Sequence, residues 1–420
     1  MKVWLQSGKA LLIGASLLMW AILIILFANF GYEKTWQLWG VHRGGSQFFF
    51  DFRLIPGAID TLRMGLDPTV ANPGDPDGRI FNYPPIWYLL AYTGISQDDT
   101  LWIGVLMIFA FFIGVFLFPE RLGKRDALLM LLVLFSPAAM LLYERANVDL
   151  VIFFLCALAV TLSETSTALS AGIVFFASLL KLFPYVGMVM FASKGRKVFL
   201  SSLLVTGIAF ALYVFLTTRN VQASWNDTMR GRDISYGANV IVMYFAHFLN
   251  STLKQWIDRD AIPVAFRLIA YVPAVLIVLL SFWRGVRKRE RLLAASQRNL
   301  NAFWMGAAIY LGTFLLGNNW DYRLAFLILV IPQLSEWSRL GNSRQRSWSV
   351  FALACVLISC WYLFYNRHPY DPAYPLPFVF DEIVNWSLFA NLARLLGASL
   401  PEWVASVVYR PMSLLRAEAA

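Results

Sequence analysis

Long apolar runs separated by short polar stretches dominate the hydrophobic pattern of this chain. A helix needs about 20 apolar residues to cross about 30 Å of hydrocarbon, and continuous apolar runs exclude a β-barrel, whose strands alternate. Together with their flanks, runs of this kind lie near 10–30, 101–118, 127–143, 148–163, 169–193, 198–217, 264–283, 299–317, 323–337 and 348–365. The pattern predicts an all-α, polytopic transmembrane helix bundle of about 10–12 spans.

The run at 169–193 needs separate treatment because it is followed by a basic stretch on the wrong side for a single crossing. Within it, KLFP (181–184) gives a reason for a break, since Pro184 removes a helix donor and disfavours helix at Phe183. We therefore expect two short helices here, or a segment that dips into the membrane and returns.

Lysine and arginine set the expected orientation, because short basic loops stay in the cytoplasm. Such stretches are 119–126, 194–197, 284–298 and 338–347, whereas the less basic loops are 31–100, 218–263 and 366–380. The first apolar run is long for a signal peptide, and no small-residue cleavage pattern follows it. We expect an uncleaved first helix in an inner (plasma) membrane protein whose long loops face the periplasm or outside.

Composition agrees with this class: 59% of the residues are hydrophobic and 14% are charged, and the mean hydropathy is +0.60. The formal charge of +10 sits between apolar runs, which argues against a nucleic-acid partner. Three cysteines within apolar runs and only three histidines predict no disulfide, no metal site and no cofactor. Without a repeat or a soluble segment, residues 1–420 are expected to form a single integral membrane domain.

The first outside loop, about residues 31–100, is rich in structure-forming signals. RLIPGAIDTLRMG (53–65) has helical periodicity and ends at Gly65, a plausible C-cap. PPIWYLLAYTGI (84–95) is too short to span and too apolar for water, so we expect an interfacial helix. Two such helices joined by a Pro- and Gly-rich loop would cover the membrane core; the alternative is a solvated loop without a role.

Charged residues gather where charge is expensive, at a cost of at least about 2.5–3.5 kcal/mol at membrane depth. Lys181 lies within an apolar run, and two polar turns sit between spans. The turns are YERANVDL (143–150), with Glu144, Arg145, Asn147 and Asp149, and GNNWDYRL (317–324), with Asn318, Asn319, Asp321 and Arg323. These groups either face a cavity and a ligand, or form ordinary turn salt bridges, with Lys181 snorkelling or paired with a backbone carbonyl.

The expected topology puts Asp51, both polar turns and the Asn239–His247 segment on the outer side. A carboxylate near several basic groups suits attack by an acceptor hydroxyl, with the carboxylate as base and Arg or Lys stabilising an anionic leaving group. Arginine donors also match the geometry of a lipid phosphate.

Several stretches in this order resemble the C-type glycosyltransferase (GT-C) fold, and glycosyltransferase family 87 in particular, the polyprenyl-phosphate-mannose-dependent mannosyltransferases. They are FDFRLIPGAIDTLRMGLDP (50–68), FNYPPIWYLL (81–90), ERANVDLVIF (144–153), SLLKLFPYVGM (178–188) and NNWDYRLAFLIL (318–329). The resemblance implies an inverting hexosyltransferase without a metal, active on the periplasmic side. In this sequence Phe50 and Phe52 flank Asp51, where related C-type enzymes carry a second acidic residue nearby.

The resemblance makes Asp51 the general base; alternatively Asp51 caps the following helix, and Asp60 is another possible base. Arg323 and Lys181 are the candidates for the donor phosphate. The candidate substrate-binding residues are Tyr83, Glu144, Arg145, Asn147, Asn319, Asp321 and His247. The alternatives are that Arg145 braces its turn as a structural residue and that His247 is an interior residue. Trp225 and Tyr236 are expected to stack on a sugar or to anchor at the interface.

The expected partners are a polyprenyl-phosphate sugar donor with mannose favoured, a lipid or glycan acceptor, and membrane lipids. The sugar and the acceptor both stay open. Two other functions compete with transfer: a transporter or flippase for a lipid-linked sugar, which often carries inverted repeats not seen here, and a non-catalytic assembly subunit.

Overall fold

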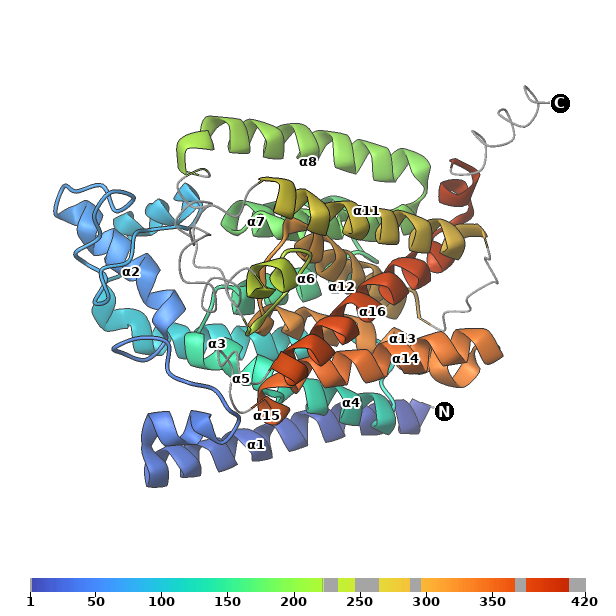
Figure 1. Ribbon diagram of the computed structural model, residues 1–420, viewed down its shortest axis with the longest axis horizontal. Helices are drawn as coiled ribbons and strands as arrows, with labels where there is room; N and C mark the ends of the chain where they lie inside the picture. Colours follow the sequence, from blue (N-terminus) through green and yellow to red (C-terminus); the bar gives the residue numbers. More distant parts are fainter. Residues whose placement is uncertain are drawn as a thin grey trace. The chain divides into compact units, whose positions relative to one another are not determined.

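The structure is a computed structural model and describes residues 2–220, 222, 233–245, 264–287, 296–366 and 375–407. Helices form nearly all of the regular structure in these residues (Figure 1). The strands found there, β1 (Ser235–Tyr236) and β2 (Asn319–Trp320), form one antiparallel pair. The predicted all-α class is therefore confirmed.

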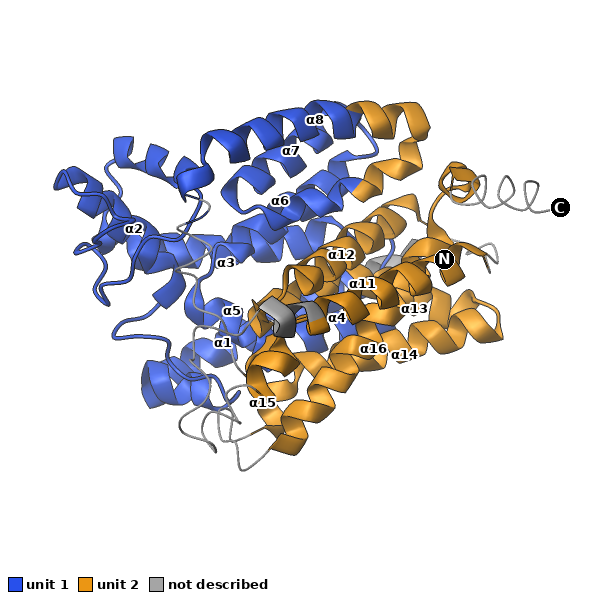
Figure 2. Ribbon diagram, turned by 45° about the horizontal axis from the view of Figure 1, so that its top comes forward, with its two compact units in different colours: residues 1–188, 202–229 blue, residues 189–201, 230–420 orange. Residues whose placement is uncertain are grey.

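The chain divides into two compact units (Figure 2), unit 1 with residues 1–188 and 202–229, and unit 2 with residues 189–201 and 230–420. In unit 1, α6 packs between α3 and α7, and α1 packs along α4. The helical elements of unit 1 are α1 (Lys2–Gln37), α2 (Phe50–Arg63), η1 (Pro85–Tyr92), η2 (Gln97–Asp99), α3 (Thr100–Leu117), α4 (Lys124–Leu134), α5 (Pro137–Arg145), α6 (Asp149–Leu162) and α7 (Thr167–Leu180).

Unit 2 is arranged around its last long helix, α16 (Pro375–Ser399), which packs against α11, α12 and α14. Both η3 (Phe183–Lys194) and α8 (Arg196–Leu216) contribute residues to each unit. The remaining elements of unit 2 are α11 (Val264–Arg287), α12 (Gln297–Leu316), η4 (Asp321–Val330), α13 (Ile331–Leu340), α14 (Ser343–Cys360) and α15 (Tyr362–Tyr365).

In the described part of the chain, 5 helices are long and apolar enough to cross a membrane, or 6 if the bent pair α4–α5 is one span. They are Ser7–Gln37, Gln97–Leu117, Arg196–Leu216, Ile269–Arg287 and Gln297–Leu316. Other apolar runs give shorter or broken elements; 323–337, for instance, becomes the 3₁₀ segment η4 followed by α13. The helical membrane character predicted from hydropathy is thus present, while 10–12 spans stays a prediction.

The predicted span at 127–143 is bent by 55° between α4 and α5. The cause is local: Ser136 is the N-cap of α5 and accepts a hydrogen bond from the Ala139 backbone N, while Pro137 occupies the first helical turn. Proline cannot donate back to the preceding turn, so the chain starts a new helix instead of continuing α4.

The predicted break at KLFP is present. Helix α7 ends at Leu180, and Lys181 has an extended backbone (φ −160°, ψ 126°) before the 3₁₀ segment η3 begins at Phe183. The Trp87 indole N donates to the Leu180 carbonyl at 3.1 Å, which satisfies one of the open acceptors at the helix end. Because of this break, Lys181 lies outside α7 and its side chain does not follow the apolar surface of that helix.

The predicted helix at 53–65 exists as α2, which begins earlier, at Phe50, and ends at Arg63. Gly65 follows with φ 76°, a left-handed turn that glycine adopts without steric cost. The second predicted helix, 84–95, is the 3₁₀ segment η1, which packs on α2 and has no buried residue. A helical element is therefore present at both positions, and a cover over the membrane core stays a prediction.

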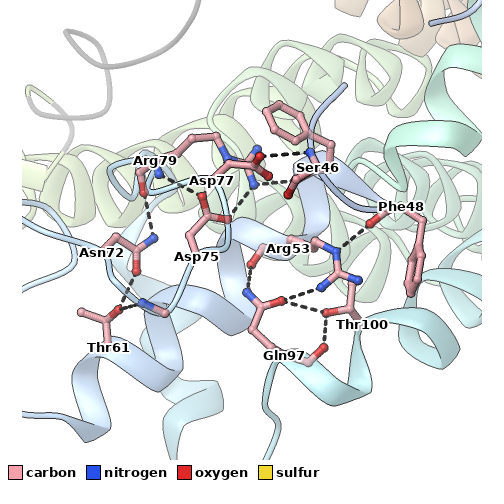
Figure 3. A network of polar contacts seen from close by, with 12 residues as sticks. Ser46, Phe48, Arg53, Thr61, Asn72, Asp75, Asp77, Arg79, Gln97 and Thr100 are labelled. Carbon is pink, nitrogen blue, oxygen red and sulfur yellow. Dashed lines mark hydrogen bonds and ion pairs between the residues drawn. The ribbon is translucent and has the colours of Figure 1, made fainter. Parts of the chain in front are cut away.

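The loop between these elements is tied to α2 by hydrogen bonds (Figure 3). The Thr61 hydroxyl donates to Asn72 Oδ1 at 2.7 Å and accepts from the Gly74 backbone N at 3.0 Å. The Asn72 amide in turn donates to the Arg79 carbonyl at 2.9 Å. Because both Thr61 and Asn72 are buried, this stretch is a docked element of unit 1, unlike the free solvated loop considered as an alternative.

Candidate functional site

Asp51 lies in the first turn of α2 and is partly buried. The helix follows Phe49, whose backbone is left-handed (φ 55°, ψ 47°), and no side chain caps this end. The suggestion that Asp51 is the N-cap is therefore wrong. A carboxylate in the first turn is nevertheless favoured by the positive helix N-terminus. A left-handed phenylalanine costs about 1–2 kcal/mol, so surrounding contacts must hold this turn in place.

Asn147 provides the hydrogen bond to Asp51, with its Nδ2 2.6 Å from Asp51 Oδ2. It sits in the turn between α5 and α6, where Ala146 adopts φ 42° and lets the chain reverse. Asn147 is 2% exposed. The sequence indicated Asp51 and Asn147 separately, and their contact is seen only in the structure.

Lys181 joins the same group from the end of α7. Its Nζ donates to Asn147 Oδ1 at 2.9 Å and forms an ion pair of 2.7 Å with Asp149 Oδ1. The same Nζ lies 5.6 Å from the centroid of the buried Tyr83 ring. The lysine is thus paired with the side chains of Asn147 and Asp149, whereas the alternatives from the sequence were snorkelling and a backbone carbonyl. Among the predicted residues, Asn147 contacts Asp51, and Lys181 lies between Asn147 and Tyr83.

Glu144 and Arg145 form the expected salt bridge at the end of α5, with 3.0 Å between Arg145 Nε and Glu144 Oε2. The Glu144 side chain is fully buried, and Tyr32 of α1 donates to its backbone carbonyl at 3.0 Å. The Arg145 Nη1 lies against Gly44, so closely that an added Cβ there would sit 1.5 Å from it. The glycine leaves room for a guanidinium next to Asp51's neighbour Phe50.

Phe50, directly before Asp51, contacts two guanidinium groups. The Arg79 Cζ lies 3.6 Å and the Arg145 Cζ 5.2 Å from the ring centroid. Arg79 also pairs with the buried Asp75 at 2.8 Å. Both cation–π contacts and the ion pair fix the start of α2. Arg79 was missed from the sequence, although Asp75 and Arg79 at i, i+4 in a Gly-rich turn carried a weak signal.

Arg53 continues this network on the next turn of α2 (Figure 3). Its Nε donates to the Phe48 carbonyl at 2.7 Å and its Nη1 to Gln97 Oε1 at 3.0 Å. Burial lowers the pKa of this guanidinium below its usual range. These two acceptors, the Phe48 carbonyl and the Gln97 side chain, are neutral, and the second bond makes Arg53 a brace between α2 and η2.

Asp60, the other base considered, has both carboxylate oxygens engaged. Its Oδ1 pairs with Arg63 at 3.2 Å and its Oδ2 accepts from the Gln97 backbone N at 3.0 Å. Unlike Asp51, it bonds the start of η2 and so ties α2 to that turn.

Asn319, Asp321 and Arg323 belong to unit 2. There Arg323 Nη1 donates to Asn319 Oδ1, and Asn319 Nδ2 donates to the Thr313 carbonyl at 2.5 Å. These bonds form one polar turn, as the sequence indicated. The role of Arg323 in binding the donor phosphate near Asp51 stays a prediction.

Unit 2 also holds buried acidic side chains, of which Asp321 was named from the sequence and the two on α16 were not. Asp381 and Glu382 on α16 and Asp321 are each at most 2% exposed. Asp381 accepts hydrogen bonds from Asn385 at 2.9 Å and Tyr365 at 3.3 Å. In the described residues, the carboxyl oxygens of Asp321 and Glu382 have no hydrogen-bond partner. Burial raises the pKa of Asp381 to about 8 and the pKa of Asp321 and Glu382 well above their usual range.

Other residues named from the sequence fall elsewhere. His247 and Trp225 lie outside the described residues. Tyr236 is 1% exposed and stacks on Tyr310 with 5.2 Å between centroids, so it is an interior residue and neither a sugar platform nor an interface anchor. Asn239 donates to the Tyr271 hydroxyl at 3.0 Å. Over the described ranges, no three His, Cys, Asp or Glu side chains are arranged to hold a metal ion.

The apolar helices indicate a membrane protein. Its candidate site is the partly buried Asp51 carboxylate, which is bonded by Asn147; the Lys181–Asp149 ion pair supports that amide. Comparison with known protein families, with curated proteins and with solved structures found no match.

Proposed function

We propose that this protein is a membrane glycosyltransferase that moves a hexose from a polyprenyl-phosphate donor to a hydroxyl group of a lipid or glycan acceptor. The observation that carries the proposal is the 2.6 Å hydrogen bond by which buried Asn147 holds the Asp51 carboxylate. The motifs that resemble the C-type glycosyltransferase fold, and family 87 in particular, support the class of donor, with mannose favoured.

In the proposed reaction Asp51 acts as the general base through Oδ1, because its Oδ2 is held by Asn147. The acceptor hydroxyl gives its proton to Asp51 while its oxygen attacks the anomeric carbon. The bond from that carbon to the phosphate oxygen breaks, and polyprenyl phosphate leaves with the electron pair. Attack from the face opposite to the phosphate inverts the anomeric configuration.

Arg145 is the cation of unit 1 best suited to the donor phosphate. Its Nε pairs with Glu144, while its side chain stays 16% exposed beside Phe50. A guanidinium presents planar donors that match phosphate oxygens and stabilises the charge that builds on the leaving group. Both cations form an ion pair with a buried carboxylate, so charge balance does not separate them. Lys181, named for this role from the sequence, donates through its one nitrogen to both Asn147 and Asp149, whereas Arg145 pairs through Nε and has further guanidinium nitrogens. We therefore assign the phosphate to Arg145.

The basic stretches between apolar runs support a site on the periplasmic side, because they favour a cytoplasmic position for the opposite helix ends. The exposed side chains of α1, among them Leu17, Leu18 and Ile24 at 64%, 62% and 64% exposed, suit contact with lipid tails. A donor carried on a long isoprenoid chain would reach Asp51 from that lipid phase.

The test is transfer by the purified protein in detergent or liposomes. Polyprenyl-phosphate mannose, glucose and arabinose are each supplied with membrane lipids and short glycans as acceptors, and products are identified by mass. Asp51→Asn, which keeps the shape of the side chain and removes the base, is expected to lower the rate by about 10²–10⁴-fold. Asp60→Asn is the matched control on the same helix and is expected to keep the rate within about threefold.

Two outcomes would overturn the proposal. One is wild-type protein that forms no product with any of the donors. The other is Asp51→Asn that transfers at the wild-type rate. Movement of a lipid-linked sugar across liposomes without formation of a product would favour the transporter or flippase instead.

A further inference from the structure

The side chain of Asn147 is held from both ends. Its Oδ1 accepts from Lys181 Nζ at 2.9 Å and from the Asp149 backbone N at 3.1 Å, while its Nδ2 donates to Asp51 Oδ2 at 2.6 Å. An amide oxygen has two acceptor sites, and both are filled by groups that can only donate. The amide therefore has one orientation, with its N–H groups facing Asp51.

The Lys181–Asp149 ion pair sets this orientation. The Asp149 side chain is fully buried and its partner Lys181 is 16% exposed, with 2.7 Å between Nζ and Oδ1. Three features of the chain place Lys181 next to Asp149. Helix α7 ends at Leu180, the backbone of Lys181 is extended, and the Trp87 indole donates to the Leu180 carbonyl. A buried ion pair that also bonds a neutral amide is a rigid support, since neither charge can leave without its partner.

We propose that Asn147 is a positioning residue for Asp51, and that the Lys181–Asp149 pair fixes the direction in which the Asn147 amide points. The proposal rests on the proposed function, in which Asp51 is the base. Asn147 moves no proton. Its bond to Oδ2 keeps the carboxylate from rotating, so that Oδ1 faces the acceptor hydroxyl. Lys181 acts through Asn147, and its task is to hold an orientation instead of binding phosphate.

The first experiment compares transfer kinetics of Asn147→Ala with those of the wild-type protein. A misplaced base costs about 10²-fold in rate, so kcat is expected to fall about 100-fold while KM for donor and acceptor changes less than about twofold. Asn391→Ala is the matched control: it removes a buried amide that bonds the Trp348 carbonyl at 2.8 Å in unit 2, and kcat is expected to stay within about twofold.

A second set of variants separates orientation from charge balance. Lys181→Arg keeps a donor and the positive charge, so kcat is expected to stay within about threefold of the wild-type value. The double variant Lys181→Met, Asp149→Leu removes both buried charges and retains the Asp149 backbone donor. If the lysine merely neutralised Asp149, the double variant would recover wild-type kcat; we expect it to stay about tenfold low, because one of the two donors to Asn147 is missing.

A readout without turnover keeps the contact testable by itself. The thermal unfolding midpoints of Asp51→Ala, Asn147→Ala and the variant that carries both changes form a double-mutant cycle. The fall in midpoint of the combined variant is expected to be smaller than the sum of the two single falls by about 2 °C. Additive shifts would overturn the positioning proposal whatever the activity. An unchanged kcat in Asn147→Ala would overturn it as well. If the cycle shows coupling but the wild-type protein transfers no sugar, the contact between Asp51 and Asn147 stands and the transferase is rejected.

Discussion

The Arg79 guanidinium lies 3.6 Å from the centroid of the Phe50 ring and also donates a 2.7 Å hydrogen bond to the Phe50 carbonyl. One side chain from the first loop thus holds both the ring and the backbone of the residue before Asp51. Arg79 is itself held by Asp75, whose side chain is fully buried. The position of the candidate base therefore depends on a loop 29 residues further along the chain.

Arg79→Ala is expected to reduce both stability and activity. It leaves the Asp75 carboxylate buried without its partner, which costs about 3–5 kcal/mol. The exposed ion pair Arg63–Asp60, with side chains 35% and 22% exposed, is the natural comparison, and Arg63→Ala is expected to cost about 1 kcal/mol or less. Unfolding in denaturant measures both; equal losses in the two variants would contradict the assignment of Arg79 as a buried brace.

Arg145→Lys tests the phosphate assignment. Lysine keeps the positive charge but loses the Nε bond to Glu144 and the planar donors that match a phosphate. We expect KM for the polyprenyl-phosphate donor to rise about tenfold and KM for the acceptor to stay within about twofold. Steady-state kinetics with each substrate varied in turn checks this, and an unchanged donor KM would remove Arg145 from the phosphate site.

Gly74→Ala tests how closely the first loop docks on α2. A Cβ at this position would sit 2.2 Å from the Gly57 carbonyl oxygen, a backbone atom that cannot swing aside. We expect a loss of about 1–3 kcal/mol in the free energy of unfolding. Gly172→Ala, with no atom within 4 Å of the added Cβ, is the control and is expected to be neutral or slightly stabilising. A neutral Gly74→Ala would show that the loop is not docked in this way.

The buried carboxyl of Asp381 predicts a pH dependence of stability. Burial raises its pKa from 3.8 to about 8, so the folded state binds this proton more tightly than the unfolded state does. The stabilisation is complete below the unfolded pKa, declines as pH rises, and is lost above about pH 8, by at most about 1.4 kcal/mol per pH unit. The unfolding midpoint is therefore expected to fall between about pH 5 and about pH 8.

Asp381→Asn is expected to reduce that slope but not to abolish it, because burial also raises the pKa of Asp321 and Glu382. Asp67→Asn is the contrasting variant: hydrogen bonds from Thr69 lower the pKa of Asp67, so its contribution is lost only as the pH falls through that lowered pKa. The slope between about pH 5 and about pH 8 should persist in this variant. A wild-type midpoint that does not change over this range would contradict a proton held on Asp381.

Local signals were sufficient for much of unit 1. Periodicity and Gly65 predicted α2 to within a few residues, and KLFP predicted the break after α7. Asp51, Asn147 and Lys181 stood out singly because polar groups are costly within or beside apolar runs. Each of these inferences uses residues close together in the chain, where helix geometry relates sequence spacing to position.

Other features depended on distant parts of the chain. Helix α16 was not predicted because Asp381, Glu382 and Asn385 interrupt its apolar character, yet the neighbouring helices bury all three. The 55° bend between α4 and α5 was not predicted either, since a run of apolar residues carries no information about direction.

The sequence by itself determined that the protein is a helical membrane protein, because hydropathy and composition act on each segment independently. Only the tertiary structure decided that Asn147, 96 positions from Asp51, donates to it, and that Lys181 orients that amide. Such contacts arise when packed helices bring distant turns together, and the chain order of the residues does not encode their distance in space.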